Sequence, residues 1–297
     1  VESGTTDTFA VVLTSQPLTD VVLTVVSGDA GEATVDVATL TFTASNWDTS
    51  QTVTVTGVDD PTVDGSQATT ITVSVDDGNS DDAFDPVLDQ TVSVTTTDND
   101  SAGFSIVESS GSTSVVESGT TDTFAVVLTS QPLTDVVLTV ASGDSGEATV
   151  DVSTLTFTAS NWDTSQTVTV TGVDDPAVDG SQATTITVSV DDGNSDDAFD
   201  SVLDKTVSVT TTDNDSAAFS IVESSGSTIV VESGTTDTFA VVLTSQPLTD
   251  VVLTVVSGDS GEATVDVSTL TFTASNWDTP QTVTVTGVDD PAVDGSQ

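Results

Sequence analysis

Carboxylates gathered in loops are the residues of this sequence best suited to chemistry. The chain has 48 Asp and Glu residues against one basic residue, Lys205, so its net charge is −47. Most of the acids are Asp, and they lie in loop-like segments such as GVDDPAVDG at 172–180 and DND at 213–215. Like charges held close together raise each other's pKa and oppose folding. A hard cation relieves this repulsion, and Ca²⁺, with about six to eight oxygen ligands in flexible geometry, suits short Asp side chains on loops.

The composition excludes several other classes of function. The chain contains no His, Cys, Met or Tyr. Without His or Cys there is no ordinary general base near neutral pH, no thiol nucleophile and no N or S ligand for a soft metal. One cation cannot neutralise a phosphate backbone or bind an anionic leaflet, so we expect no nucleic-acid partner. The longest apolar runs are far too short to span a bilayer, so we expect no membrane insertion.

An internal repeat sets the organisation of the chain. The segment that begins VESGTTDTFAVVLTSQPLTD at Val1 recurs at Val116 and again at Val231, with a period of 115 residues. This period is too long for a solenoid coil or a propeller blade and fits one small domain per repeat. Both ends cut the repeat within a unit, so we expect the chain to be a window onto a longer array.

The elements that must position these acids are β-strands. Residues alternate with period two in runs such as TVTVT at 167–171, where Val would face a core and Thr the solvent. In the second copy we predict seven strands, at about 113–117, 121–129, 134–141, 153–158, 166–173, 182–190 and 205–212. Seven short strands in about 100 residues indicate an all-β fold of tandem immunoglobulin-like Greek-key sandwiches. Trp162 is read as a core residue, with a place at a module junction as the alternative.

Such a sandwich brings four acidic segments of the second copy to one pole. The connectivity predicts that this pole receives Glu117, Asp144, Glu147, Asp151, Asp174, Asp175, Asp179, Asp213 and Asp215. A second acidic run, DDGNSDDAFD at 191–200, falls at the opposite pole; it resembles half of a calcium loop but lacks the spacing of an EF-hand loop, so it is the weaker candidate site. Adaptation to high salt would also make the surface acidic. It would scatter acids along the strand faces, whereas these faces carry Thr and Ser, which favours calcium; the two explanations are compatible.

The repeat resembles the Calx-beta domain. The motifs that carry this resemblance are VVESG at 115–119, the stretch from Phe157 to Val170, Asp174-Asp175 followed by Asp179, and the DND triplet at 213–215. The resemblance sets modules at residues 1–100, 101–215 and 216–297, the first without its initial segment and the third without its last two strands. It implies a calcium cluster at the pole that faces the next module. Where the family usually has Asp-Tyr, this sequence has Asp151-Val152.

Carried over by motif position, the resemblance implies one set of ligands per copy. In the complete copy the set is Glu117, Asp151, Asp174, Asp175, Asp179, Asp213 and Asp215. In the first copy it is Glu2, Asp36, Asp59, Asp60, Asp64, Asp98 and Asp100. In the third copy it is Glu232, Asp266, Asp289, Asp290 and Asp294.

These observations favour a structural function. Near-identical tandem copies are similar to the extender regions of giant bacterial surface adhesins, so we expect an extracellular or cell-surface stalk or filament with Ca²⁺ at its junctions. The expected partners are neighbouring modules and identical chains in a fibre. One alternative is an adhesive, ligand- or mineral-binding module. Recognition loops usually carry aromatic residues and Arg, whereas these loops have few aromatic residues and no Arg. Another is a filament subunit that donates strands to its neighbours. An enzyme is not expected, because the acids lie in Gly/Ser/Asp loops without an apolar pocket.

Overall fold

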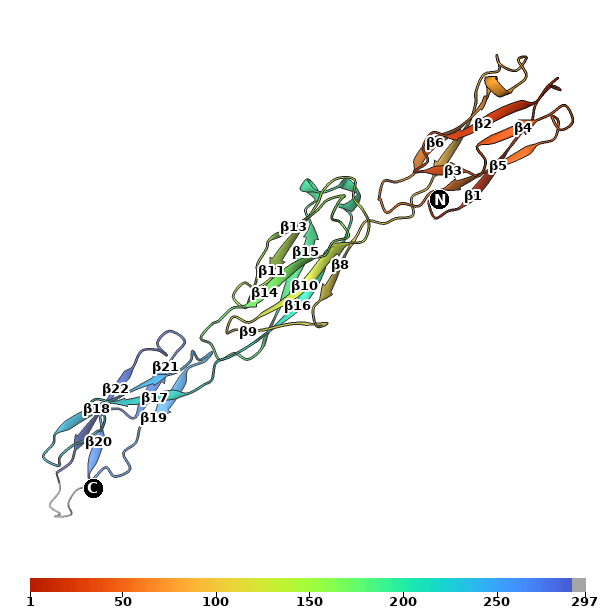
Figure 1. Ribbon diagram of the computed structural model, residues 1–297. Coiled ribbons are helices and arrows are strands. Elements are labelled where there is room, and N and C mark those ends of the chain that lie inside the picture. Colours follow the sequence, from red (N-terminus) through yellow and green to blue (C-terminus); the bar gives the residue numbers. More distant parts are fainter. Residues whose placement is uncertain (290–297) are drawn as a thin grey trace.

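The computed structural model describes residues 1–289 and shows an elongated rod of three β units that follow one another along its length (Figure 1). The units follow the internal repeat, and the middle unit begins before Val116, with a strand that starts at Phe104. The fold is all-β and consists of tandem immunoglobulin-like Greek-key sandwiches. The boundaries between residues 100 and 101 and between 215 and 216 stay predictions.

The middle unit is formed by two sheets that pack face to face. Its strands are β8 (Phe104–Glu108), β9 (Thr113–Val116), β10 (Thr121–Leu128), β11 (Val136–Ser142), β12 (Ala148–Val150), β13 (Thr154–Phe157), β14 (Gln166–Gly172), β15 (Gln182–Val190) and β16 (Lys205–Thr212). One sheet has the order β12-β14-β10-β8 and the other β13-β11-β15-β16-β9. Most pairs are antiparallel, but β9 runs parallel to β16.

The first and third units repeat parts of this pattern. The first contains β1 (Thr6–Val11), β2 (Val21–Ser27), β3 (Ala33–Val35), β4 (Thr39–Phe42), β5 (Gln51–Gly57), β6 (Gln67–Val75) and β7 (Gln90–Thr96), in sheets β1-β5-β3 and β4-β2-β6-β7. The third contains β17 (Phe219–Glu223), β18 (Thr236–Leu243), β19 (Val251–Thr254), β20 (Ala263–Val265), β21 (Thr269–Phe272) and β22 (Gln281–Gly287), in sheets β17-β18-β22-β20 and β19-β21.

Alternation along the strands builds the core. In β16 every second side chain from Val207 to Thr211 is buried, and the Ser and Thr residues between them face solvent. Phe104, Phe124, Phe157 and other fully buried side chains fill the space between the sheets. Burial of each large apolar side chain stabilises the folded state by roughly 1.5–3 kcal/mol. The half-buried Trp162 packs against this same core, in agreement with its reading as a core residue.

The middle unit has nine strands where the sequence predicted seven. The two that were missed are β8 and β12. The chain crosses from one sheet to the other at residues 109–112, so the first edge strand is split into β8 and β9. β12 has three residues, which is too short for an alternating pattern to stand out.

Short 3-10 helices lie in the loops between β6 and β7 and between β15 and β16. They are η1 (Asp77–Asn79), η2 (Asp192–Asn194) and η3 (Asp197–Phe199). Among the described residues, no helix has the length and apolar character needed to cross a membrane.

Candidate metal centre

Pairing between β9 and β16 places Glu117 at the end of the sandwich. Glu117 directly follows β9, and its backbone N–H donates to the carbonyl of Thr212, the last residue of β16, at 3.1 Å. Its side chain is therefore carried next to Asp213 and Asp215, which follow β16. Glu117 is 1% exposed, although carboxylates are rarely buried without a partner.

Close packing of backbone around Glu117 depends on Gly172 at the end of β14. A Cβ on Gly172 would collide with the carbonyl group of Val116. Gly57 and Gly287 have the same relation to Val1 and Val231 in the other two copies. The absence of a side chain at this position lets the segment that carries the buried glutamate lie directly against the β14 strand.

Asp213 ties two acidic segments together. Its Oδ2 accepts the backbone N–H groups of Gly180 at 2.8 Å and Asp179 at 3.1 Å, and its Oδ1 accepts that of Asp215 at 2.6 Å. These bonds, with Gly180 the largest contributor, hold the pKa of Asp213 below its ordinary value. The triplet after β16 and the loop between β14 and β15 are thus fixed against each other with Asp213 ionised.

Glu117, Asp213 and Asp215 form a group that fits a cation. Each offers a carboxylate oxygen, and these oxygens lie within 4.8 Å of one another. Oε1 of Glu117 is buried with no hydrogen-bond partner, while Oε2 lies 3.5 Å from the donating N–H of Asn214. Burial, followed by the charges of Asp213, Asp175 and Asp179, raises the pKa of Glu117.

The protein itself supplies no positive charge to this group. The chain's one basic residue, Lys205, starts β16, whereas the group follows its end, roughly 23 Å away at about 3.3 Å per residue. Its Nζ donates to the carbonyl of Phe104 at 2.5 Å and lies 5.3 Å from the centre of that ring. A buried carboxylate with one unpartnered oxygen and no positively charged partner in the protein fits an external cation.

A second group lies beside the first. It consists of Glu147, Asp175 and Asp179, again with carboxylate oxygens within 4.8 Å. Oε2 of Glu147 and Oδ1 of Asp179 are buried and unpartnered. The carbonyl of Glu147 accepts the N–H of Val173 at 2.9 Å, which fixes this residue against the end of β14. Burial, with the charges of Asp179 and Asp175, raises the pKa of Glu147.

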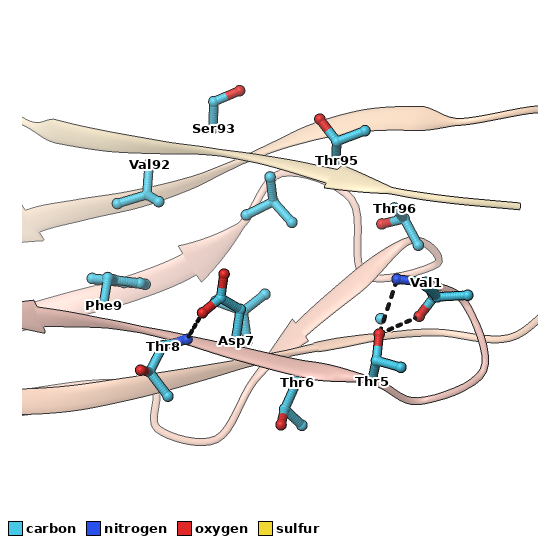
Figure 2. A pocket seen from close by; sticks show the side chains of 13 residues that line it. Val1, Thr5, Thr6, Asp7, Thr8, Phe9, Val92, Ser93, Thr95 and Thr96 are labelled. Carbon is cyan, nitrogen blue, oxygen red and sulfur yellow. Dashed lines mark hydrogen bonds between the residues drawn. The ribbon is translucent and has the colours of Figure 1, made fainter.

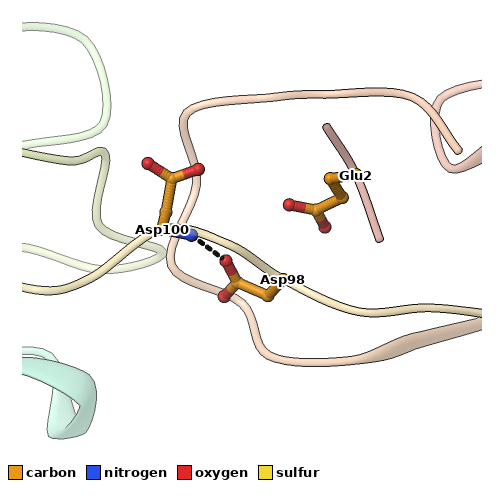
Figure 3. A group of neighbouring side chains, drawn as sticks. All are labelled: Glu2, Asp98 and Asp100. Carbon is orange, nitrogen blue, oxygen red and sulfur yellow. Dashed lines mark hydrogen bonds between the residues drawn. The ribbon is translucent and has the colours of Figure 1, made fainter. Parts of the chain in front are cut away.

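The first copy repeats the arrangement around Glu2. Glu2, Asp98 and Asp100 form a group with oxygens within 4.8 Å, and Figure 3 shows the side chain of Glu2 directed toward Asp98. Glu2 is fully buried, and both of its carboxylate oxygens lack a partner. Burial is the main cause of its raised pKa, followed by the charge of Asp98. The Oδ1 of Asp98 accepts the N–H of Asp100, as Asp213 does for Asp215.

Some predicted ligands lie at this pole without joining a group. Asp174 is exposed and accepts a hydrogen bond from Nδ2 of Asn214 at 2.9 Å, and Asp59 is exposed in the equivalent place. Asp174, Asp175, Asn214 and Asp215 line a shallow, open hollow. In the first copy Asp60 accepts the N–H of Thr62 at 2.7 Å, and Asp64 has one buried, unpartnered oxygen.

Asp151 and its counterparts Asp36 and Asp266 are placed away from the three groups. Each carboxylate accepts a backbone N–H from the neighbouring long strand at 2.8 Å, with Thr169, Thr54 and Thr284 as donors. That bond, the largest contributor, lowers the pKa of Asp36 and of Asp266. Since β12 pairs with β14 from Ala148 to Val150, the chain has moved inward along β14 before it reaches Asp151.

The third copy is described in part. Glu232 is half-buried and Asp289 is exposed. The predicted ligands Asp290 and Asp294 lie outside the described residues.

The acidic run at 191–200 has a structural role. Asp196 is 7% exposed, and its carboxylate accepts the N–H groups of Thr134 at 2.8 Å and Ala198 at 3.0 Å. Phe199 from the same run is fully buried in the core. The carboxylate that turns inward is therefore satisfied by the backbone, and within residues 1–289 this run contributes to none of the three acidic groups.

A different hollow lies between β1 and β7 of the first copy (Figure 2). Its lining is mostly Thr and Val, and its one carboxylate, Asp7, accepts the N–H of Thr8 at 2.7 Å. This hollow therefore brings no second carboxylate beside Asp7.

Comparisons with known proteins find likeness in three dimensions and none in sequence. The chain matches no protein-family model and no curated protein. Among solved structures it is similar to domains 4 and 5 of the S-layer protein SbsC, with 21% identity, a TM-score of 0.31 and coverage of 64% of this chain and 70% of that one. It is also similar to CBD12 from CALX1.2, with 15% identity, a TM-score of 0.28 and coverage of 63% and 76%.

Proposed function

We propose that this chain is part of the structural stalk of a large, repetitive cell-surface protein, and that Ca²⁺ bound at one pole of each sandwich stiffens the array. The observation that carries the proposal is a buried glutamate beside two aspartates at the end of each of the first two units, with at least one buried carboxylate oxygen that has no hydrogen-bond partner. In the middle unit these residues have no protein cation near them, and the pole that both groups occupy faces the next unit of the rod (Figure 1).

The donor set favours calcium over other cations. All six residues of the two groups in the middle unit offer carboxylate oxygen, which suits a hard cation. Their loops leave room for water and for irregular coordination, which Ca²⁺ tolerates better than Mg²⁺. Extracellular sites of this weak class bind with dissociation constants of about 0.1–1 mM. We accordingly place the protein outside the cell, where calcium reaches such concentrations, and we assign it no catalytic role.

Small-angle scattering on the full chain tests the stalk. In millimolar CaCl₂ we expect the distance distribution of one extended, rigid particle. In EDTA with NaCl at matched ionic strength we expect a shorter average length and a flexible profile, because the repulsion between acids and the freedom of the linkers are restored. The same flexible profile in both buffers would contradict the proposed function.

A further inference from the structure

The loop that carries two of the candidate cation ligands also contacts the next unit. Between β14 and β15, residue Ala177 forms a parallel β-bridge with Gln246, which lies between β18 and β19 of the third unit. The N–H of Gln246 donates to the carbonyl of Pro176 at 2.6 Å, and the N–H of Val178 donates to the carbonyl of Gln246 at 3.1 Å. Two backbone hydrogen bonds therefore join consecutive units.

This bridge lies between two carboxylates of one group. Asp175 and Asp179 flank the bridging residues 176–178, and both belong to the group that includes Glu147. One oxygen of Asp175 also accepts the N–H of Ala177 at 2.7 Å, which orients the bridging residue itself. Movement of the bridge must then move the ligands on either side of it.

The same incoming loop contacts the other group. The hydroxyl of Ser245, which is 6% exposed, donates to Oδ1 of Asp215 at 2.9 Å and to the carbonyl of Ser216 at 3.2 Å. Asp215 belongs to the group of Glu117 and Asp213. Ser245 thus contacts a carboxylate of one group directly, and Gln246 contacts the backbone between two carboxylates of the other.

The junction between the first and second units repeats these contacts. Gln131 bridges Thr62, with hydrogen bonds to Pro61 at 2.7 Å and Val63 at 3.0 Å. The hydroxyl of Ser130, which is 3% exposed, lies 3.4 Å from Oδ1 of Asp100. A hydrogen bond from the Thr62 hydroxyl to Oε1 of Gln131, at 3.2 Å, is added here, where the second junction has Ala177.

The contacting loop has the same internal bond whether or not a unit lies against it. Nε2 of Gln131 and of Gln246 donates to a carbonyl of its own unit, at 2.7 Å in each case. Gln16, the counterpart in the first unit, makes the same bond to Ala44 at 2.8 Å, yet Gln16 and the preceding Ser15 are exposed. The loop is thus preformed, and little ordering is needed when it docks.

We propose that the Ser-Gln loop at 130–131 and 245–246 is a docking surface for the cation-binding loop of an identical preceding unit, so that docking and calcium binding reinforce each other. This inference rests on the proposed function. Docking holds Asp175, Asp179 and Asp215 in place before the cation arrives. By reciprocity, a cation that fixes these carboxylates strengthens the bridge to the next unit by the same factor.

The test is a calcium titration of the full chain against a chromophoric chelator, with Ser130→Ala and Ser245→Ala combined. Even the lower bound for a lost hydrogen bond to a charged group predicts roughly 10-fold weaker binding. The matched control is Ser15→Ala, which removes the same hydroxyl from the unit where it is exposed and should leave the affinity unchanged. A second variant, Gln131→Pro with Gln246→Pro, removes the backbone N–H groups that donate across the junctions. It also removes the internal hydrogen bond of each Gln side chain, and Gln16→Pro controls for that loss because Gln16 makes the same bond without a junction.

The possible results distinguish the docking proposal from the proposed function. Weaker binding in both junction variants, with controls like wild type, supports the docking surface. Wild-type affinity in both junction variants would overturn the linkage between docking and binding while the proposed function stands. A wild-type chain that takes up no calcium would overturn both proposals.

Discussion

Replacement of Glu117 by Gln should change stability in opposite directions with and without calcium. The amide has nearly the same shape as the carboxylate but carries no charge. In chelator the substitution removes a buried charge that has an unpartnered oxygen and a raised pKa. In calcium it removes an anionic ligand from the group with Asp213 and Asp215.

The expected sizes follow from linkage. A site at a hundredfold excess of calcium over its dissociation constant adds about 2.7 kcal/mol to the folded state. For a unit the size of the 115-residue repeat, at about 2.1 cal/mol/K per residue, this raises Tm by about 11 °C. A ~100-fold weaker site at the same calcium concentration leaves a shift of about 2 °C. In chelator, Glu117→Gln removes a buried charge that no cation compensates, and partial protonation of Glu117 in the wild type limits the gain. The substitution should therefore stabilise the unit by about 1–2 kcal/mol, which raises Tm by ~4–8 °C.

Scanning calorimetry of the full chain is the assay, because the unchanged units provide an internal reference. The transition of the substituted unit should separate upward in EDTA, and in 10 mM CaCl₂ it should gain far less than the others. Asp151→Asn is the matched control. It makes the same charge change in the same unit at an exposed position, and its side-chain oxygen still accepts from Thr169. If Glu117→Gln lowered Tm equally in both buffers, Glu117 would be a structural residue and the reasoning would be refuted.

Three further outcomes are expected. In EDTA, Tm measured by circular dichroism should rise as pH falls from 7 toward 5. The raised pKa values of Glu117 and Glu147 mean that the folded state takes up protons before the unfolded state does, so stability is lost as pH rises through those values. A steady fall in Tm from pH 7 to pH 5 would contradict this prediction. Asp213→Ala should weaken calcium binding by about tenfold or more in a titration, since it removes a ligand and frees the N–H groups that join two acidic segments; unchanged affinity would place the cation elsewhere. Gly172→Ala should destabilise the middle unit by about 1–3 kcal/mol in urea melts, because its Cβ meets the Val116 carbonyl; a neutral effect would show that this contact relaxes freely.

Long alternating strands were predictable from the sequence, and short or crossing ones were not. The predicted strands at 166–173, 182–190 and 205–212 correspond to β14, β15 and β16, where buried side chains, mostly Val, recur at every second position. The crossing of the first edge strand between sheets depends on which neighbours offer free backbone groups. A single strand's residue pattern does not record that choice, so β8 was missed.

The pole could be predicted from the connectivity, but its grouping of ligands depended on strand register. Glu147 was placed at the correct end yet left out of the ligand set implied by resemblance, and the structure groups it with Asp175 and Asp179. Asp151 was placed in that set because it stands where the Calx-beta domain usually has an Asp-Tyr pair before a strand. It instead accepts a hydrogen bond from Thr169, because the pairing of the short β12 with β14 carries it away from the end. Burial of Glu117, the strongest indication of a cation, depends on a parallel pairing that no local motif announces.

Calorimetric titration of CaCl₂ into the full chain, against NaCl and MgCl₂ at matched ionic strength, tests the central claim most directly. We predict saturable binding of calcium at millimolar or lower concentration, lost progressively when Glu2 and Glu117 are replaced by Gln. Heats that are the same for all three salts, or unchanged in the double variant, would contradict a calcium site at the pole of each unit.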